Sequence, residues 1–286
     1  MKKVLSLYAM CLLLACETQI NFDGLESNSQ PVIYAKLFSD ATVEVTVLAS
    51  APAKGVFEND RFIDDAIIKL ITDKADTFDI PFVADGFYSD QLNFCLDDTF
   101  QLTFLSEIGR SVSDKLKIPA TPSYTDVRIL PYTVQNFSYT NRLSLDIPFD
   151  ESEIFAINVI GFNEENSTAF EVFPIEIGDG ADITACSGFN GTSDLIYEAD
   201  FSCYPNGLLP MNIAFSIPEE YINKNNQLSV ILKSASDSFL EFESAFYDYQ
   251  AIDLFFEEPL PPYSNFDMGF GYFGTFNQIK FSLDIP

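Results

Sequence analysis

The chain has 286 residues, 43 of them acidic and 15 basic, and its formal net charge is −28. It contains no histidine, which excludes Ser-His-Asp and Cys-His nucleophile pairs, imidazole-ligated zinc or haem, and histidine acid–base catalysis. The negative charge would repel a phosphate backbone and argues against a nucleic-acid partner, whereas a hydrophobic content of 47% is enough for a packed core, and the length predicts about two domains.

Residues 1–15 have the features of an export signal. Lys2 and Lys3 precede an uncharged, mainly apolar stretch, 4–15. This stretch is shorter than the ~20 residues that span a bilayer, but its length is typical of the apolar region of a signal peptide. The letters LLLAC at 12–16 resemble the bacterial lipobox, which implies cleavage after residue 15 and lipidation of Cys16. The alternative is an ordinary secretory signal in which Cys16 is incidental.

Residues 16–30 are polar and lack a hydrophobic period, which predicts a lipidated flexible tether about 20 Å long. The acyl chains on Cys16 would hold the body at a membrane. Glu17 stands where an inner-membrane retention signal would usually place aspartate, so the N-terminus resembles that of an outer-membrane lipoprotein. Whether the body faces the periplasm or the cell surface stays open.

The first predicted domain, 31–118, has the pattern of a β-sandwich. Val43, Val45 and Val47 alternate with polar residues, as in a half-buried strand. The segment 62–72 fits a helix or a strand, and its β-branched residues favour a strand. A turn is expected at Asp85-Gly86. Several short strands separated by turns predict an immunoglobulin-like sandwich.

Two prolines interrupt this pattern at 118–124 and predict a domain boundary. The second predicted domain, 125–286, is also mostly β and sandwich-like. One short helix is expected in it, because Phe239, Phe242, Phe246 and Tyr249 recur at helical spacing. Ser238 and Glu241 form a capping-box pattern at its start. The predicted fold class is therefore all-β in the main, with two sandwich domains and one helix in the second.

Several segments of the body match a known family. They are the valine-rich strand at 43–47, AIIKLITD at 66–73, the Asp85-Gly86-Phe87-Tyr88 turn, IPATPSYTDV at 118–127 and EPLPPYSNFDMGFGYFGTFN at 258–277. Over nearly the whole mature chain the sequence resembles the lipoprotein family called domain of unknown function 4249. The resemblance implies an outer-membrane lipoprotein of a Gram-negative bacterium, with a TonB-dependent outer-membrane receptor as an expected partner.

The closing run, 258–277, supplies the candidate ligand or partner surface. Its glycines would let a backbone approach a ligand, and its aromatic rings would form an apolar or sugar-stacking face. The residues expected on this surface are Tyr263, Asn265, Phe270, Tyr272 and Phe273. The alternative is an edge strand with glycine bulges whose aromatic side chains fill the core.

Neither a catalytic residue nor a metal site nor a cofactor is predicted. The acidic pairs at 64–65, 97–98, 164–165, 219–220 and 257–258 are interpreted as solvated surface or turn features, because adjacent residues of a strand point to opposite faces. The oxygens of 178–182, GDGAD, could serve calcium, but the EF-hand spacing is absent and an acidic turn is the better interpretation.

Three cysteines remain after cleavage and acylation: Cys95, Cys186 and Cys203. In an oxidising compartment a disulfide between Cys186 and Cys203 is plausible, and its closed loop would contribute ~3 kcal/mol. Spacing alone cannot establish the pairing. Cys95, between Phe94 and Leu96, is interpreted as a small core residue of a strand.

These patterns favour a non-catalytic accessory lipoprotein that binds a TonB-dependent transporter or its ligand. Two alternatives stay open: a structural or adhesive surface module, and a hydrolase that uses two carboxylates from separate loops. The acidic surface predicts that a protein partner presents basic loops and that the association weakens with salt.

Overall fold

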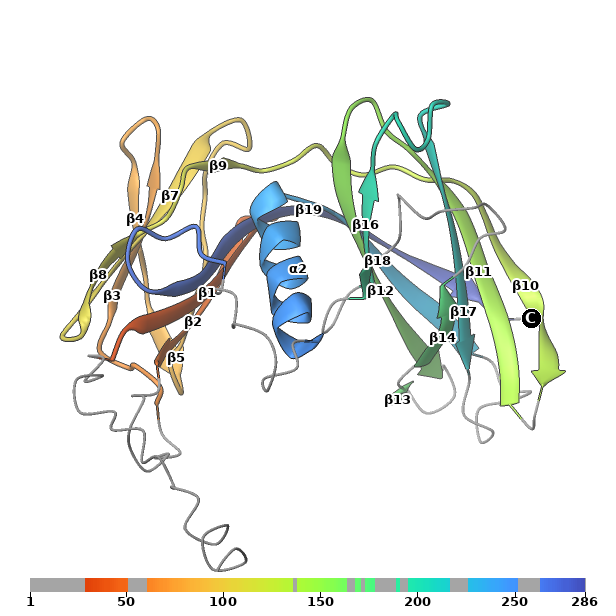
Figure 1. Ribbon diagram of the computed structural model, residues 1–286, viewed down its shortest axis with the longest axis horizontal. Coiled ribbons are helices and arrows are strands. Elements are labelled where there is room, and N and C mark those ends of the chain that lie inside the picture. Colours follow the sequence, from red (N-terminus) through yellow and green to blue (C-terminus); the bar gives the residue numbers. More distant parts are fainter. Residues whose placement is uncertain are drawn as a thin grey trace, which may run out of the picture.

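The computed structural model (Figure 1) describes residues 29–50, 61–135, 138–163, 168–170, 173–177, 189–190, 195–216, 226–251 and 263–285. Strands dominate this part of the chain, and the predicted all-β class is confirmed. Within the described ranges, no helix has the length and apolar character needed to cross a membrane. The predicted signal, Cys16 and most of the predicted tether lie outside these ranges.

The strands form two sandwiches. The first contains β1 (Pro31–Phe38), β2 (Thr42–Ala49), β3 (Ile67–Thr72), β4 (Thr77–Ile80), β5 (Phe82–Ala84), β6 (Phe87–Gln91), β7 (Thr99–Ser106), β8 (Gly109–Val112) and β9 (Leu116–Lys117). The second contains β10 (Thr125–Gln135), β11 (Ser138–Pro148), β12 (Glu153–Asn163), β13 (Thr168–Phe170), β14 (Phe173–Ile177), β15 (Phe189–Asn190), β16 (Leu195–Ala199), β17 (Leu208–Ser216) and β18 (Asn226–Ala235). The helix α2 (Asp237–Ala251) and the last strand, β19 (Phe270–Asp284), follow.

One ten-stranded sheet runs through both sandwiches. Its order is β15-β16-β12-β18-β19-β1-β2-β6-β5, with β13 beside β12. A five-stranded sheet, β4-β3-β7-β8 with β9 beside β7, packs against the part of the long sheet that contains β1 and β2. A four-stranded sheet, β10-β11-β17-β14, packs against the part that contains β12 and β18. The two smaller sheets lie at the outer ends of the molecule (Figure 1).

The strand β19 joins the two sandwiches. Its first half pairs in parallel with β1, from Val32↔Phe270 to Phe38↔Phe276. Its second half pairs antiparallel with β18, from Ala235↔Phe276 to Gln227↔Asp284. The predicted C-terminal domain, 125–286, therefore needs a correction, because residues 270–276 complete the first sandwich. The linker at 118–124 does lie between β9 of the first sandwich and β10, the first strand of the second.

The first core follows from period-two alternation. In β1 and β2 every second side chain is buried, and these side chains meet those of β3 and β7 across the sandwich. The fully buried members include Ile33, Ala35, Leu37, Val43, Val45, Val47, Leu70, Phe100, Leu102 and Phe104. The segment 62–72, ambiguous in sequence, is a strand from Ile67 onward.

The predicted turn at Asp85-Gly86 connects β5 to β6. Both residues have positive φ, 48° and 68°, as a two-residue hairpin turn of the type I′ requires. A Cβ on Gly86 would lie 2.4 Å from the Val47 carbonyl oxygen, so the residue must be glycine for packing as well as for its backbone conformation.

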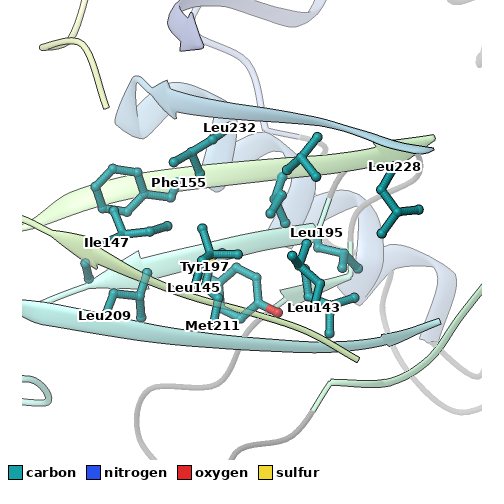
Figure 2. Close-up of a cluster of buried hydrophobic side chains, with 14 of the residues drawn as sticks. Leu143, Leu145, Ile147, Phe155, Leu195, Tyr197, Leu209, Met211, Leu228 and Leu232 are labelled. Carbon is teal, nitrogen blue, oxygen red and sulfur yellow. The ribbon is translucent and has the colours of Figure 1, made fainter. Parts of the chain in front are cut away.

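The second core lies between the β11–β17 pair and the β12–β18 pair (Figure 2). Leu143, Leu145 and Ile147 of β11 alternate inward, as do Leu209, Met211 and Ile213 of β17. The opposite layer contributes Phe155, Ile157, Leu228, Val230 and Leu232. Each side chain buried in this way contributes roughly 1.5–3 kcal/mol.

The helix α2 packs on the face of the ten-stranded sheet that points away from both smaller sheets, and it lies between the two sandwiches (Figure 1). Phe239 is buried there against Tyr272 and Phe276 of β19, at ring-centroid distances of 5.7 and 4.9 Å. The predicted helix is confirmed, but the capping box is wrong. The helix already begins at Asp237, and the Ser238 hydroxyl donates to the Phe273 carbonyl at 3.0 Å.

Glu153, at the start of β12, gives a pH-dependent prediction. Burial raises the pKa of its carboxyl above the ordinary value of 4.5, and nearby Asp150 and Glu151 raise the pKa further. Well below pH 4.5 the carboxyl is protonated in both the folded and the unfolded protein. As the pH rises through the raised folded-state pKa, the partly buried carboxyl must ionise, and the free energy of unfolding decreases. Glu153→Gln should therefore increase the free energy of unfolding at neutral pH by about 0.5 kcal/mol, a modest value because the group is partly solvated.

Urea denaturation at neutral pH and again below pH 4.5 tests this expectation, and the gain should disappear in acid. Glu107→Gln, which removes the same charge from the exposed β7–β8 turn, is the control. An equal gain from Glu107→Gln would show that the effect comes from net charge and not from the burial of Glu153.

Candidate functional site

The structure separates the five residues predicted to form a surface. Phe270, Tyr272 and Phe273 lie in the first half of β19, which pairs with β1, whereas β18 pairs with β19 from Phe276 onward. Residues 270–273 are therefore part of a strand and not of a ligand-facing loop. Tyr272 and Phe273 are buried, as the alternative of a strand with core-filling aromatic side chains expects. Tyr272 and Phe273 are 3% and 0% exposed and point to opposite faces, because successive strand residues alternate. Phe273 enters the first core, and Tyr272 lies beneath α2.

Asn265 has a structural role. Its side-chain oxygen accepts from the Phe273 N–H and its amide nitrogen donates to the Phe273 carbonyl, both at 2.8 Å. The side chain thus pairs with two buried backbone groups of β19. A buried backbone group without a hydrogen-bond partner would lower the stability of the fold. Tyr263, two residues earlier, is half-buried against the hydrophobic cluster beneath α2, which includes Phe239 and Tyr272.

A cavity of about 310 Å³ lies beside α2, on the same face of the long sheet. This volume is at the lower end of the range for small-molecule pockets. Among the described residues its lining is Tyr34, Lys36, Glu44, Thr46, Phe87, Phe242, Glu243, Phe246 and Tyr272. Of the five residues predicted from sequence, the structure brings Tyr272 into this lining.

Strand register explains the floor of the cavity. Tyr272, Tyr34, Thr46 and Phe87 are successive partners across β19, β1, β2 and β6, so they form one row on one face. Two residues further along β1, Lys36 stands directly opposite Glu44 of β2. The floor therefore has a mainly aromatic row beside a charged pair.

The helix α2 supplies the wall. The Phe242 ring contacts Tyr272 at a centroid distance of 4.6 Å and Tyr34 at 5.6 Å. Phe246, one turn further on, stacks on Phe242 at 6.1 Å and is 36% exposed, so it lies near the opening. Offset and edge-to-face contacts of this kind stabilise aromatic clusters by about 0.5–1.5 kcal/mol per pair. The wall is thus held in place by the rings that face the cavity.

Of the lining residues that the structure describes, three are charged: Lys36, Glu44 and Glu243. Glu243 comes from α2 and is only 7% exposed, whereas Lys36 and Glu44 are half-buried on the floor. The described part of the lining thus contains two carboxyl groups and one ammonium group.

Tyr34, in the cavity, and Tyr263, near α2, keep their protons. Burial raises the pKa of Tyr34 above its ordinary value of 10.0. Burial also raises the pKa of Tyr263 well above that value, and a hydrogen bond to Glu241 with the nearby negative charges adds to the effect. Both phenols are therefore neutral hydrogen-bonding groups at physiological pH.

Most of the cavity residues were not predicted from the sequence. The alternation at 42–47 does place Glu44 and Thr46 on the face opposite the valines, but which face a strand presents to a cavity depends on its partners. Tyr34 and Lys36 have the same alternating signal within β1. The helical spacing of Phe242 and Phe246 pointed to a buried face, and here that face forms a wall of the cavity.

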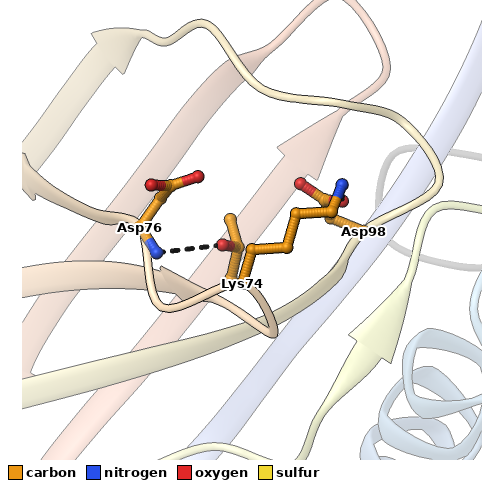
Figure 3. A network of polar contacts seen from close by, with 4 residues as sticks. Lys74, Asp76 and Asp98 are labelled. Carbon is orange, nitrogen blue, oxygen red and sulfur yellow. Dashed lines mark hydrogen bonds and ion pairs between the residues drawn. The ribbon is translucent and has the colours of Figure 1, made fainter.

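The acidic pairs differ from expectation at one position. Asp98 is 4% exposed and accepts a hydrogen bond from the Lys74 side chain, which reaches across to it in Figure 3. This hydrogen bond raises the pKa of Lys74. A buried carboxylate requires such a cationic partner, so Asp98 is a structural ion pair and not a solvated surface group. Asp64 and Asp65 are exposed as expected, and the other pairs lie outside the described residues.

The metal predictions are tested only in part. No group of three or more cysteine, aspartate or glutamate residues suited to a metal ion occurs in the described ranges. The segment 178–182, interpreted as an acidic turn, lies outside those ranges.

The cysteines lead to a prediction about labelling. Cys95 is free and exposed, so the expectation of a buried strand residue was wrong: the chain forms a loop there. Cys203 is disulfide-bonded, and its expected partner, Cys186, lies outside the described residues.

Iodoacetamide should modify Cys95 in the native protein and leave Cys203 unmodified until a reductant is added. Mass spectrometry of the peptides reads the outcome, and labelling of Cys203 without reductant would contradict it.

Comparisons with known proteins add little. No family model matches this sequence, and no curated protein matches it. Among solved structures, a marsupial T cell receptor is similar at 8% identity and a TM-score of 0.22, over 70% of this chain and 93% of that one. A putative membrane anchored protein from Corynebacterium diphtheriae is similar at 14% identity and a TM-score of 0.22, over 72% of this chain and 54% of that one. A TM-score this low carries no argument about function.

Proposed function

We propose that this protein is a non-catalytic accessory lipoprotein, anchored in the outer membrane through acylated Cys16, that binds a ligand for a TonB-dependent transport system. The observation that carries the binding role is the aromatic cavity between α2 and the β1, β2 and β6 strands. Its floor and wall come from rigid elements, which position binding groups well.

The leader supports the anchoring part of the proposal. The lipobox-like LLLAC at 12–16 would place diacylglycerol and an N-acyl chain on Cys16, and more than one chain gives durable membrane attachment. Mass spectrometry of the protein purified from its native envelope should find residues 1–15 removed and Cys16 acylated. An unmodified Cys16, or a retained leader, would contradict the anchor.

The transport part is tested by affinity purification from gently solubilised membranes. The acylated protein should recover a β-barrel receptor, and the recovery should decrease with salt because the net charge of the whole chain, −28, favours a basic partner surface. A chain exported by an ordinary secretory leader and lacking Cys16 is the control for anchoring. Repeated purification without a receptor would count against a transport role.

One observation favours a second candidate, a carboxylate-dependent hydrolase. Glu44 and Glu243 reach the same cavity from separate elements, as the acid and base of a glycosidase must. The small volume and the Lys36 partner opposite Glu44 fit a binding pocket better. Turnover of chromogenic glycosides that both Glu44→Gln and Glu243→Gln abolish would establish the hydrolase instead.

A further inference from the structure

The size of the cavity limits what it can hold. In general, an apolar cavity of about 150 Å³ already takes up a benzene molecule, and the cavity beside α2 has a volume of about 310 Å³. This volume suits one ring with a short substituent. It is small for a drug-sized ligand or for one with several rings.

The rings that keep accessible surface lie on two sides of the cavity. Tyr34 and Phe87 on the floor are half-buried, whereas Tyr272, in the same row, is 3% exposed and offers a ligand little surface. Phe242 and Phe246 form the helix wall, and their rings are nearly parallel, at an interplanar angle of 16°. Rings on two sides favour a flat aromatic ligand, because aromatic pairs gain from edge-to-face and offset contacts that a saturated ring cannot make.

Polar groups lie beside these rings on the floor. Lys36 of β1 stands opposite Glu44 of β2, and Thr46 is two residues further along β2, on the same face. An ammonium group only donates hydrogen bonds and a carboxylate only accepts them. A hydroxyl group of a ligand does both, so it can bond to the two side chains at once. Glu243 already has an interaction within the protein, and this arrangement does not require it.

We infer that the cavity binds a molecule with a single aromatic ring and a short substituent that ends in a hydroxyl group. The ring lies between the half-buried floor rings and the helix wall, and the hydroxyl group lies beside Lys36, Glu44 and Thr46. This inference rests on the proposed function, because it takes the cavity as the ligand site. It does not depend on the net charge of the lining.

The probe 2-phenylethanol carries both of these features. Its analogue 2-cyclohexylethanol has the same substituent on a saturated ring, and methyl glucoside carries hydroxyl groups without an aromatic ring. Saturation-transfer NMR on the purified protein should detect binding of 2-phenylethanol. Competition should give 2-cyclohexylethanol an affinity about fivefold lower, because it cannot make the ring contacts, and methyl glucoside should not compete.

Two matched pairs of substitutions test where the ligand lies. Phe87→Leu removes a floor ring and should weaken binding of 2-phenylethanol about fivefold. Phe82→Leu, in the exposed strand β5 of the same hairpin and outside the described lining, should leave it unchanged. Thr46→Val should also weaken binding about fivefold, through the loss of one hydrogen bond, whereas Thr42→Val, four residues earlier in β2, should not. Circular dichroism confirms that each variant is folded.

Preferential binding of 2-cyclohexylethanol or of methyl glucoside would overturn the inference, and so would equal effects of the two members of either pair. Binding of none of the probes would also overturn it. The proposed transport role fails separately, through the absence of a receptor in the purification. Recovery of a receptor without binding of 2-phenylethanol would thus remove this inference alone.

Discussion

Gly271→Ala should lower the free energy of unfolding by about 3 kcal/mol or more, because two costs combine at this position. A Cβ there would lie 2.0 Å from the Ile33 carbonyl oxygen and 2.7 Å from its carbonyl carbon. These are backbone atoms of the neighbouring strand, which cannot rotate away. The backbone of Gly271 also has a φ of 107°, a conformation that strains any residue with a side chain.

Gly109→Ala is the matched control. Gly109 also has a positive φ, 147°, but a Cβ there would meet nothing within 4 Å. Its substitution should cost about 1–2 kcal/mol from backbone strain alone. Urea denaturation followed by circular dichroism gives both values. Equal losses would show that the contact between β19 and β1 is not the source of the requirement at Gly271.

The consequence of Gly271→Ala should extend to the cavity. Gly271 lies immediately before Tyr272, which forms part of the cavity floor and contacts Phe242. Moving β19 away from β1 would separate Tyr272 from its register partner Tyr34. The close pairing of β19 with β1 lets the two sandwiches share one sheet. The same pairing places Tyr272 beside Tyr34 in the floor of the cavity.

Asn265→Ala should lower the free energy of unfolding by about 2–4 kcal/mol. The substitution removes both hydrogen bonds to Phe273, each 2.8 Å long. It leaves the buried Phe273 N–H without a partner, at a cost of about 1–3 kcal/mol, whereas the Phe273 carbonyl keeps the hydrogen bond from the Ser238 hydroxyl. Asn265→Asp should also be destabilising, since it replaces the donor to the Phe273 carbonyl by a carboxylate oxygen and buries a charge.

Asn206→Ala is the control for Asn265. Asn206 is exposed, and its side chain accepts one hydrogen bond, from the Leu208 N–H at 3.3 Å. Its loss should change stability by no more than about 0.5 kcal/mol. Urea denaturation measures both variants, and a loss at Asn265 as small as that at Asn206 would refute the structural role given to this side chain.

The aromatic closing run illustrates why the candidate site was only partly predictable. Its composition marked a region of close packing, and Tyr272 does reach the cavity. Asn265 was expected at a surface but is 5% exposed and bonded to Phe273. The same polar residue serves either role, and only its surroundings distinguish them.

Local patterns in the sequence were sufficient for the class of structure. The alternation of Val43, Val45 and Val47, the Asp85-Gly86 turn and the spacing of Phe239, Phe242 and Phe246 each depend on residues close together in the chain, so period and turn chemistry specify them. The choice of strand partners does not depend on such patterns. Val32 pairs with Phe270 across the whole length of the body, and no local period encodes that pairing.

The cavity belongs to this second category. The Tyr272–Tyr34–Thr46–Phe87 row comes from four strands in three separate regions of the chain, and it becomes a row only when β19 lies beside β1. The sequence by itself determined which side chains alternate outward and which stretch forms the helix. Tertiary structure decided that those side chains share a cavity, because strand pairing and helix packing are selected by burial and hydrogen bonding between residues distant in sequence.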